Sequence, residues 1–371
     1  MKIGINALGL QPSHRGGAEA VFLNLVKGFN NIGYSDKIIY FCYPQMADVV
    51  RERSPKSEIV IVRDTINDKH ARISACIVQT FVFHRIYKKY DLDIVFFVNA
   101  EVGLLKYKIP SVVIPHDIQN VARPQINKNK LQYYLNYFSY KNTFLKVDKI
   151  IAISDEDKND ITRCFPFSER KVVKIYNPID VRASEVEIIE RKQDYILAVN
   201  IQYAHKNTET LICAFKKLIL KYPEFKLKLA GAKNDYTEKL EELVNKLGLS
   251  DKVDFLGFIT KAELENLWSR TSLYVNPSLF EGFGMTSVES MIYGAPTLLS
   301  DLDVNREVTD NLCTYFNDML NADKLANEMK NMLEQKYDKK VYKERAYKIS
   351  QKYNVNEIGK QYIELFLTML E

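Results

Sequence analysis

A loop with two glycines and one carboxylate lies where the chain passes from an apolar run into a helical pattern. The loop spans residues 276–285, which read Asn-Pro-Ser-Leu-Phe-Glu-Gly-Phe-Gly-Met. A helix that begins near Gly284 presents free backbone N–H groups and the positive end of its dipole, which together form a natural seat for phosphate. Gly282 and Gly284 let the backbone approach an anion closely. The spacing therefore predicts a phosphate-binding loop.

Two carboxylates flank this predicted phosphate seat. Glu281 lies in the loop, and Glu289 lies further along the helix. A carboxylate cannot bind phosphate, but it accepts hydrogen bonds from vicinal hydroxyl groups. The two carboxylates therefore suggest a sugar on one side of the phosphate and a ribose on the other. The alternative is an ordinary helix start with a favourable acid in it. The second Glu and the following Gly294-Ala295-Pro296 favour the ligand site.

A histidine and an aspartate follow another apolar run. His116 and Asp117 come directly after residues 112–115, at the predicted rim of a sheet. A histidine at a strand end can be purely structural, but this place and the neighbouring aspartate favour a functional group. We expect Asp117 to shape the turn or to orient His116 rather than to act as a base.

Two Asp-Leu-Asp triplets offer the spacing that binds a metal ion in other transferases. They stand at residues 91–93 and 301–303, directly before and directly after a predicted strand. Aspartates at such places usually make turns. We therefore predict no metal site, and the turn interpretation is preferred for both triplets.

Short apolar runs alternate with helical patterns along the whole chain. In the first half they predict strands at 2–6, 38–41, 59–62, 94–98, 112–115 and 150–153. In the second half they predict strands at 195–199, 227–230, 253–256, 273–275 and 297–299. Runs that are apolar throughout suit strands buried on both faces of a parallel sheet. The sequence thus predicts an α/β protein with two doubly wound units.

A charged stretch, residues 181–194, separates the two series and is predicted to be the linker. We expect an N-terminal domain at 1–182 and a C-terminal domain at 183–352, followed by a helix at 353–371. Ligands of open α/β sheets bind at the carboxyl ends of the strands. Two such domains in series imply a cleft between them, where those ends face each other.

Composition excludes several other classes. The chain has 371 residues, of which 27% are charged and 46% hydrophobic, so intrinsic disorder is a poor interpretation. Its five cysteines have no paired spacing, which argues against a disulfide framework or a zinc site. The net charge of +5 fits anionic partners such as phosphates but does not demand nucleic acid. No apolar run approaches a membrane span, and Met1 leads straight into a strand, so we expect a cytoplasmic protein.

The segment 123–149 combines basic and aromatic residues with a single acid, Asp148. Its basic residues are Arg123, Lys128, Lys130, Lys141, Lys146 and Lys149, and its aromatic residues are Tyr133, Tyr134, Tyr137, Phe138, Tyr140 and Phe144. A basic, aromatic helix can rest on the inner face of an anionic membrane. It can equally be a solvated face over a packed aromatic stripe, and the sequence leaves both open.

Several of these stretches resemble the signature of a known family. Residues 281–296 are similar to the E-G-F-G-M-x-x-V-E-S-M-x-x-G-x-P string of the retaining glycosyltransferases called family 4, which have the GT-B fold. Further stretches resemble that family at Gly16-Gly17-Ala18-Glu19, Pro115-His116-Asp117, Ile151-Ala152-Ile153-Ser154 with Lys158, Tyr176-Asn177-Pro178-Ile179-Asp180, and His205-Lys206-Asn207. The resemblance covers nearly the whole chain and implies two Rossmann-like domains facing across a cleft, with the C-terminal helix crossing back onto the N-terminal domain.

The resemblance also implies roles for individual residues, which would bind the parts of a nucleotide-diphosphate sugar. Glu281 would bind the transferred sugar, and Glu289 the ribose. Lys206 would neutralise the diphosphate, helped by the backbone at Gly282, Phe283, Gly284 and Met285, and Gly17 would cap it from the other domain. The backbone at Phe258 would meet the base, and His116, with Asp117 beside it, would lie against the donor sugar.

The sequence departs from the family pattern in the phosphate loop. Family members often carry a glycine and an arginine where Asn200 and Ile201 stand, and an arginine where His205 stands. Lys206 would then meet the phosphate charge alone, or with another residue. This departure concerns the tightness of donor binding rather than its location.

The resemblance implies metal-independent transfer of a hexose, such as mannose or glucose, from a GDP- or UDP-linked donor to a glycan or lipid-linked acceptor. Bacterial surface polysaccharide synthesis is the expected setting, and no further cofactor is implied. Two alternatives stay open at this point. One is a sugar-nucleotide 2-epimerase of the same fold, and the other is a non-catalytic subunit that keeps the fold as a scaffold.

Overall fold

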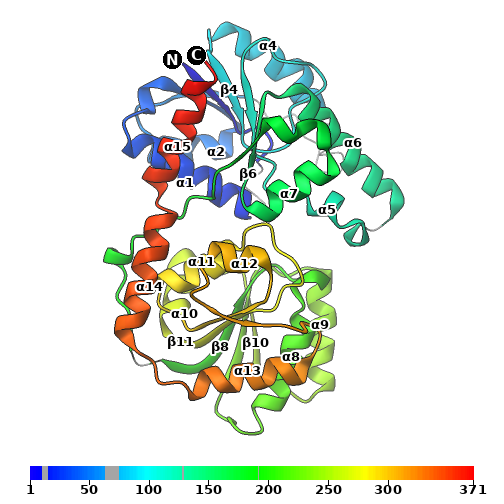
Figure 1. The fold of residues 1–371 in the computed structure, drawn as a ribbon, viewed down its shortest axis with the longest axis vertical. Helices are drawn as coiled ribbons and strands as arrows, with labels where there is room; N and C mark the ends of the chain where they lie inside the picture. Colours follow the sequence, from blue (N-terminus) through cyan, green and yellow to red (C-terminus); the bar gives the residue numbers. More distant parts are fainter. Residues whose placement is uncertain (11–15, 63–74, 128, 191) are drawn as a thin grey trace. The chain divides into compact units, whose positions relative to one another are not determined.

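The chain forms two compact units (Figure 1). The structure is a computed structural model, and it describes residues 1–10, 16–62, 75–127, 129–190 and 192–371. Unit 1 comprises residues 1–180 and 353–371, and unit 2 comprises residues 181–352. The division falls two residues before the boundary expected from the sequence. Lys128 of the basic segment and Arg191 of the charged stretch lie outside the described residues.

Unit 1 is built on a seven-stranded parallel sheet. Its strands are β1 (Ile3–Asn6), β2 (Ile38–Cys42), β3 (Glu58–Ile61), β4 (Ile94–Phe97), β5 (Ser111–Val113), β6 (Lys149–Ala152) and β7 (Val172–Lys174). They lie in the order β3-β2-β1-β4-β5-β6-β7. The order reverses between β1 and β4, and this reversal defines a doubly wound sheet.

Helices surround this sheet. They are α1 (Gly17–Asn31), α2 (Pro44–Arg53), α4 (His84–Ile86), α5 (Gln119–Ala122), α6 (Lys130–Lys146), α7 (Asp155–Cys164) and α15 (Val355–Thr368). A π-helical segment, Val78–Phe83, leads into α4.

Unit 2 repeats the same plan with six parallel strands. They are β8 (Gln193–Val199), β9 (Lys226–Ala230), β10 (Val253–Gly257), β11 (Thr271–Asn276), β12 (Thr297–Ser300) and β13 (Thr314–Phe316). Their order is β10-β9-β8-β11-β12-β13, so the reversal falls between β8 and β11. The helices are α8 (Thr208–Leu218), α9 (Asp235–Lys246), α10 (Lys261–Arg270), α11 (Met285–Ile292), α12 (Asp303–Val308), α13 (Ala322–Glu334) and α14 (Lys339–Lys352).

The alternation of side chains along β8 explains why helices cover both faces of its sheet. Successive strand residues point to opposite faces. Ile196 and Ala198 pack with residues of α8, α9 and α13. Tyr195 and Leu197 pack in a second cluster that includes Trp268 of α10. Because both faces are apolar, each needs its own layer of helices, as the unbroken apolar runs predict.

The predicted strands are all present, and two further strands were not predicted. β7 and β13 are each three residues long and form an edge of their sheet. Most of their residues are only partly buried. An edge strand needs little apolar surface, so its sequence carries only a weak pattern.

The C-terminal helix α15 packs on α1 within unit 1. Gly28 of α1 and Gly359 of α15 meet at the contact, and a Cβ on Gly28 would lie 2.3 Å from the Val355 carbonyl oxygen. Around this contact Tyr362 makes edge contacts with Phe29 and Phe96, at 6.1 and 5.3 Å between ring centroids. The absence of side chains at the two glycines thus lets the helix backbones approach and seats α15 on the core.

The charged stretch between the two strand series is packed against unit 2. Lys192 donates to the carbonyl oxygens of Ser269 and Gly294, at 2.8 and 3.0 Å. Ile188 is buried and lies against Gly294. The prediction of a linker over all of 181–194 was therefore too broad, because single apolar and basic residues anchor its second half.

Substitution of Gly28 by alanine should destabilise unit 1. Alanine in a helix interior normally gains up to about 1 kcal/mol over glycine, but here its methyl group would meet backbone, and overpacking costs about 1–3 kcal/mol. We expect a net loss for Gly28→Ala and a smaller loss for Gly359→Ala, whose Cβ would meet its nearest atom at 3.3 Å.

Urea unfolding followed by circular dichroism measures this loss. The fluorescence of Trp268, the only tryptophan, reports unit 2 and serves as an internal control. A Gly28→Ala protein that is more stable than the parent would contradict the close contact.

Candidate functional site

The loops after β8 and β11 meet at the reversal point of the unit 2 sheet. The loop after β8 leads into α8 on one face of the sheet, whereas Tyr293, at the end of α11, packs on the other face. Because the helices after these two strands lie on opposite faces of the sheet, the ends of the strands stay accessible. Such points bind ligands in open α/β sheets. Lys206 lies in the first loop and Glu281 in the second.

Lys206 and Glu281 form an ion pair at this point. The Lys206 Nζ lies 2.7 Å from Oε1 of Glu281, and the two side chains are 18% and 10% exposed. Burial alone would raise the pKa of the Glu281 carboxyl. The Lys206 ammonium and hydrogen bonds from Ser278 and Asn276 outweigh burial and hold that pKa below its ordinary value. Glu281 is therefore an ionised acceptor at neutral pH.

Two asparagines fix the positions of the two loops through side-chain hydrogen bonds. Asn276, the last residue of β11, donates to Glu281 at 3.3 Å and accepts from the Ser278 hydroxyl at 2.7 Å. Asn207 adopts a left-handed conformation with φ of 55° before α8. Its side chain donates to the carbonyl oxygens of Pro277 and Met319, at 3.1 and 2.7 Å. Because asparagine tolerates positive φ, it can end the first loop and tie it to the second.

His205 is an aromatic support in the first loop rather than a cation. Its ring stacks between Tyr203 and Phe280, at 5.8 and 4.7 Å between centroids. Burial, together with the neighbouring Lys206 charge, lowers the pKa of His205 to about 4. The ring is therefore neutral at physiological pH, and it does not replace the positive charge of an arginine.

The helix α11 begins at the second loop. Gly284 has φ of 81° and forms the N-cap, and as a glycine it has no side chain with which to cap the helix. Such an end presents backbone N–H groups that are not used within the helix. Gly282 and Phe283 are buried in the loop before it, and Met285 is the first helical residue.

Glu289 lies on α11, partly buried. Burial raises its pKa to about 7, with a smaller lowering from Lys261 and a smaller raising from Glu265. Among the described residues its carboxylate has no hydrogen-bond or ion-pair partner.

Phe258 is exposed and follows Gly257, which has φ of 65° and accepts a hydrogen bond from the Gly231 backbone at 2.9 Å. Phe258 therefore lies beside the ends of β9 and β10.

In unit 1 the predicted residues follow strands β1 and β5. Gly17 is the first residue of α1, the helix after β1. His116 and Asp117 form a turn with φ of 64° and 123°. The His116 Nε2 lies 2.8 Å from the Val98 carbonyl oxygen, so Nε2 donates and Nδ1 is left as an acceptor. Burial lowers the pKa of His116 to about 4, partly countered by this bond.

Comparison with known proteins identifies the family. The model for Glycosyltransferase Family 4 matches residues 15–183, and the model for Glycosyl transferases group 1 matches residues 182–349. The chain belongs to the family 4 glycosyltransferases. The two matches overlap at residues 182–183 and together cover residues 15–349, and they confirm the resemblance noted from the motifs.

Curated relatives of this glycosyltransferase include mannosyltransferases. The O-antigen chain mannosyltransferase RfbU of Salmonella typhimurium is 30% identical over 202 residues, which is 54% of this chain and 55% of that protein. Mannosylfructose-phosphate synthase of Agrobacterium fabrum is 36% identical over 112 residues, 28% of this chain and 25% of that protein. The alignments thus span about half or less of the curated relatives.

Solved structures confirm the GT-B fold of two Rossmann-like domains. Sucrose-phosphate synthase from Thermosynechococcus elongatus has a TM-score of 0.81 at 18% identity and covers 100% of this chain and 99% of that one. Anabaena HepE in complex with UDP-glucose has a TM-score of 0.74 at 16% identity, covering 99% and 100%.

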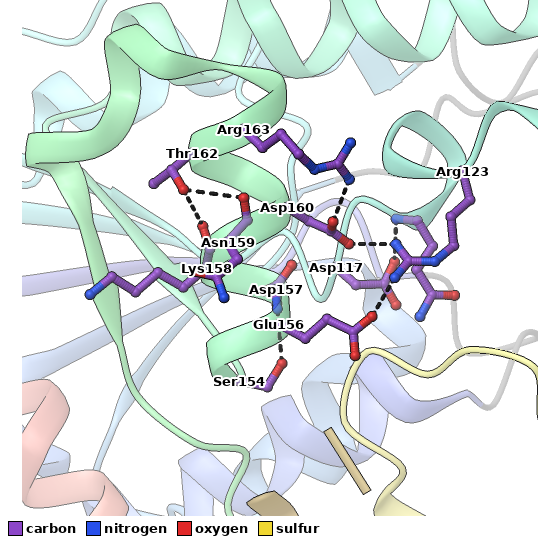
Figure 2. A network of polar contacts seen from close by, with 11 residues as sticks. Asp117, Arg123, Ser154, Glu156, Asp157, Lys158, Asn159, Asp160, Thr162 and Arg163 are labelled. Carbon is purple, nitrogen blue, oxygen red and sulfur yellow. Dashed lines mark hydrogen bonds and ion pairs between the residues drawn. The ribbon is translucent and has the colours of Figure 1, made fainter. Parts of the chain in front are cut away.

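A network of polar contacts on α7 lies close to Asp117 of the glycosyltransferase (Figure 2). Arg123 forms ion pairs with Glu156 and Asp160. Asp157 is buried and accepts from the Ile153 backbone at 3.0 Å. Burial raises the pKa of Asp157 well above its ordinary value, and the neighbouring Asp117, Asp160 and Glu156 raise it further. Arg123 therefore balances this group of acids.

The two Asp-Leu-Asp triplets serve local structure. Asp91 has φ of 49°, and Asp93 accepts from the Lys2 backbone at 2.6 Å. Asp301 pairs with Arg306 at 2.5 Å, and Asp303 opens α12. Within the described ranges, no three His, Cys, Asp or Glu side chains gather in a way that could hold a metal ion.

The structure brings Lys206 and Glu281 together and sets the start of α11 in the loop that carries Glu281. It places Gly17 at the start of α1, and His116 and Asp117 shortly after the end of β5, all in unit 1. Asn207, Asn276 and Arg123 lie in stretches that the sequence analysis singled out, but their supporting roles were not predicted. Of the three, only Asn207 could have been predicted from a local pattern. It stands directly before an apolar helix, and asparagine is a preferred residue at the N-cap position.

The stability of unit 2 should fall in mild acid because His205 is buried as a neutral ring. The unfolded histidine has a pKa near 6.5, whereas the folded one is near 4. The folded state thus disfavours the proton, and stability that is complete above pH 6.5 is lost as pH falls toward 4. We expect a loss of about 1–2.5 kcal/mol by pH 4.5 from this residue.

The difference between the parent and His205→Gln isolates this loss from the titration of carboxylates. Urea unfolding at pH 7 and pH 4.5, followed by Trp268 fluorescence, measures both proteins. If the free energy of unfolding falls equally in the two proteins between these pH values, then the prediction that His205 is buried as a neutral ring is wrong.

Proposed function

We propose that this protein is a retaining glycosyltransferase that moves a hexose from a nucleotide-diphosphate sugar to a glycan or lipid-linked acceptor in surface polysaccharide synthesis. The observation that carries the proposal is the Lys206–Glu281 ion pair beside the start of α11, at the reversal point of the unit 2 sheet. Mannose is the first donor sugar to test, because RfbU and mannosylfructose-phosphate synthase are mannosyl enzymes by name. UDP-glucose, bound in Anabaena HepE, is the second.

The diphosphate of the donor would bind to Lys206 and to the backbone N–H groups at the start of α11. Lys206 carries a full positive charge and the N–H groups carry a partial one. Both groups are held in position before the reaction begins. Negative charge grows on the diphosphate as the sugar leaves, so fixed donors lower the barrier without a strong acid. Since Lys206 and the helix end can do this work, we propose that transfer needs no metal ion.

The two carboxylates would recognise the hydroxyl groups of the donor. Glu281 is ionised at neutral pH and can accept hydrogen bonds from the transferred sugar. Glu289 can accept from the ribose once it loses its proton. In unit 1, the neutral His116 would face the donor sugar, and its bond to Val98 fixes the ring. The backbone at Phe258 would contact the base, and Gly17 would approach the diphosphate.

The donor must open the Lys206–Glu281 ion pair in order to bind. A complete donor offers phosphate to Lys206 and hydroxyls to Glu281, so both charges regain partners. A free nucleoside diphosphate satisfies Lys206 but leaves the buried Glu281 carboxylate without its counter-charge, which is costly. The site therefore favours the intact donor over the nucleotide product.

A transfer assay tests the proposed function. The protein is incubated with GDP-mannose or UDP-glucose, with and without bacterial membrane extract as acceptor, and nucleoside diphosphate release and labelled product are measured. We expect acceptor-dependent transfer, unaffected by EDTA and abolished in a folded Glu281→Ala variant. Conversion of a donor alone to a different sugar would indicate an epimerase instead. Failure to bind any nucleotide sugar in a thermal-shift screen would favour a scaffold.

The ion pair predicts opposite effects of two substitutions on nucleoside diphosphate affinity. Lys206→Ala should weaken binding by about 1.5–3 kcal/mol, because it removes a charged hydrogen-bond donor. Glu281→Gln should strengthen binding, because the Lys206 ammonium then no longer has to break an ion pair with a carboxylate before it binds the diphosphate. Isothermal titration calorimetry measures both, and Lys221→Ala, which breaks the exposed pair with Glu334, is the control. Weaker binding in Glu281→Gln would contradict the proposed competition.

Donor affinity should rise with pH because of Glu289. Its pKa is about 7 in the protein without donor, and only the ionised form accepts both ribose hydroxyls. Between pH 6 and pH 8 we expect affinity for a nucleotide sugar to increase about tenfold. Nucleotide sugars are suitable because their diphosphate diester does not titrate in this range. A Glu289→Gln protein that shows the same increase would exclude Glu289 as the cause.

A further inference from the structure

Helix α6 of unit 1 is apolar on two opposite sides. The inner side packs on the core, where Tyr137 and Phe144 each contact Phe165, at 5.1 and 5.2 Å between ring centroids. The outer side carries five large hydrophobic side chains that are each more than half exposed: Leu131, Tyr134, Leu135, Phe138 and Leu145. The sequence left a packed aromatic stripe and a membrane-facing helix as alternatives, and the structure shows that α6 has both a packed and an exposed apolar side.

The exposed apolar side of α6 continues onto the neighbouring segments. The Gly103 carbonyl accepts from Asn142 and Lys146 of α6, at 2.9 and 3.2 Å. The next residue, Leu104, donates its backbone N–H to the Thr80 hydroxyl at 2.9 Å. This loop therefore joins α6 to the π-helical segment. It adds exposed Leu104 and Leu105, and the π-helical region adds exposed Ile77 and Phe81. We call these nine side chains the apolar strip.

The segments that carry the apolar strip contain no acid. Residues 77–148 hold ten of the chain's 52 Lys and Arg residues and five of its 47 Asp and Glu residues, and none of these five acids lies on α6, in the π-helical segment or beside Leu104 and Leu105. This stretch therefore has a net formal charge of +5, whereas the rest of the chain has as many acidic as basic residues. Arg123 is used by Glu156 and Asp160. The exposed basic residues are Arg85, Lys88, Lys89, Lys106, Lys108 and Lys130.

We propose that the apolar strip docks on a lipid surface with anionic headgroups. Large exposed hydrophobic side chains bounded by lysine and arginine suit the interface of a bilayer, where the apolar groups enter and the basic groups meet phosphate. A second copy of the chain fits this surface poorly, because it would bring two regions of net positive charge together. The proposed docking is peripheral because it uses one exposed side of α6 and the neighbouring side chains, and no α-helix of the described residues has the length and hydropathy of a membrane span. It does not depend on the proposed catalytic activity.

Vesicle binding tests the proposal with the full chain. Flotation with vesicles of phosphatidylcholine alone, or with about a third phosphatidylglycerol, measures the partition coefficient. We expect binding to the anionic vesicles that weakens as salt rises, and little binding to the neutral ones. Leu135→Glu/Phe138→Glu should lower the anionic partition coefficient at least tenfold. The matched control is Leu220→Glu/Leu320→Glu, which changes two leucines that are 82% and 71% exposed in unit 2.

A second variant tests the charge separately. Lys106→Gln/Lys108→Gln should lower binding about fivefold per lysine removed, without touching an apolar side chain. Unchanged thermal unfolding shows that each variant is folded. Equal binding to both kinds of vesicle, no effect of either variant, or an equal effect of the control would overturn the proposal. So would a parent protein that binds no vesicle but forms dimers that Leu135→Glu/Phe138→Glu dissociates, since the strip would then be a self-association surface.

Discussion

The burial of both faces of the parallel sheets determines most of this structure. A strand such as β8, apolar on both sides, needs helices above and below it, so the chain must wind in one direction and then in the other. The reversal leaves two neighbouring strands whose loops run to opposite faces. In unit 2 these loops carry Lys206 and Glu281. The position of the candidate site is thus a consequence of how the sheet is covered, and side chains at the strand ends supply only the chemistry.

Charges at the candidate site are paired before any ligand arrives. Glu281 is balanced by Lys206, whereas His205 is kept neutral by burial. Glu289 differs, because its pKa is raised to about 7 and no described residue pairs with it. If the proposed donor binds here, it would exchange partners with one ion pair and recruit one unpaired carboxyl group. The neutral ring of His205 packs against Tyr203 and Phe280 and so supports the loop. A second cation at this position would compete with Lys206 for Glu281.

The sequence predicted the elements whose signal is local and missed those whose role is set by distant partners. Apolar runs predicted every central strand, but the short edge strands β7 and β13 were missed, because half-exposed residues leave little pattern. The motif at 281–296 predicted the loop and the helix start. The Lys206–Glu281 pair could not be predicted, since 75 positions separate its members. Arg123 was counted among the basic residues of segment 123–149, and only the fold shows that Glu156 and Asp160 neutralise it.

The glycine contact between α1 and α15 has a consequence for the order of events during synthesis. Unit 2 is continuous, but unit 1 consists of residues 1–180 and the last segment, 353–371. At about 5–20 residues per second, the ribosome needs roughly 10–35 seconds to make the intervening 172 residues. During that time the faces of Phe29 and Phe96 that will receive Tyr362 stay uncovered. Unit 2 can thus complete its core while the older part of the chain still waits for its final helix.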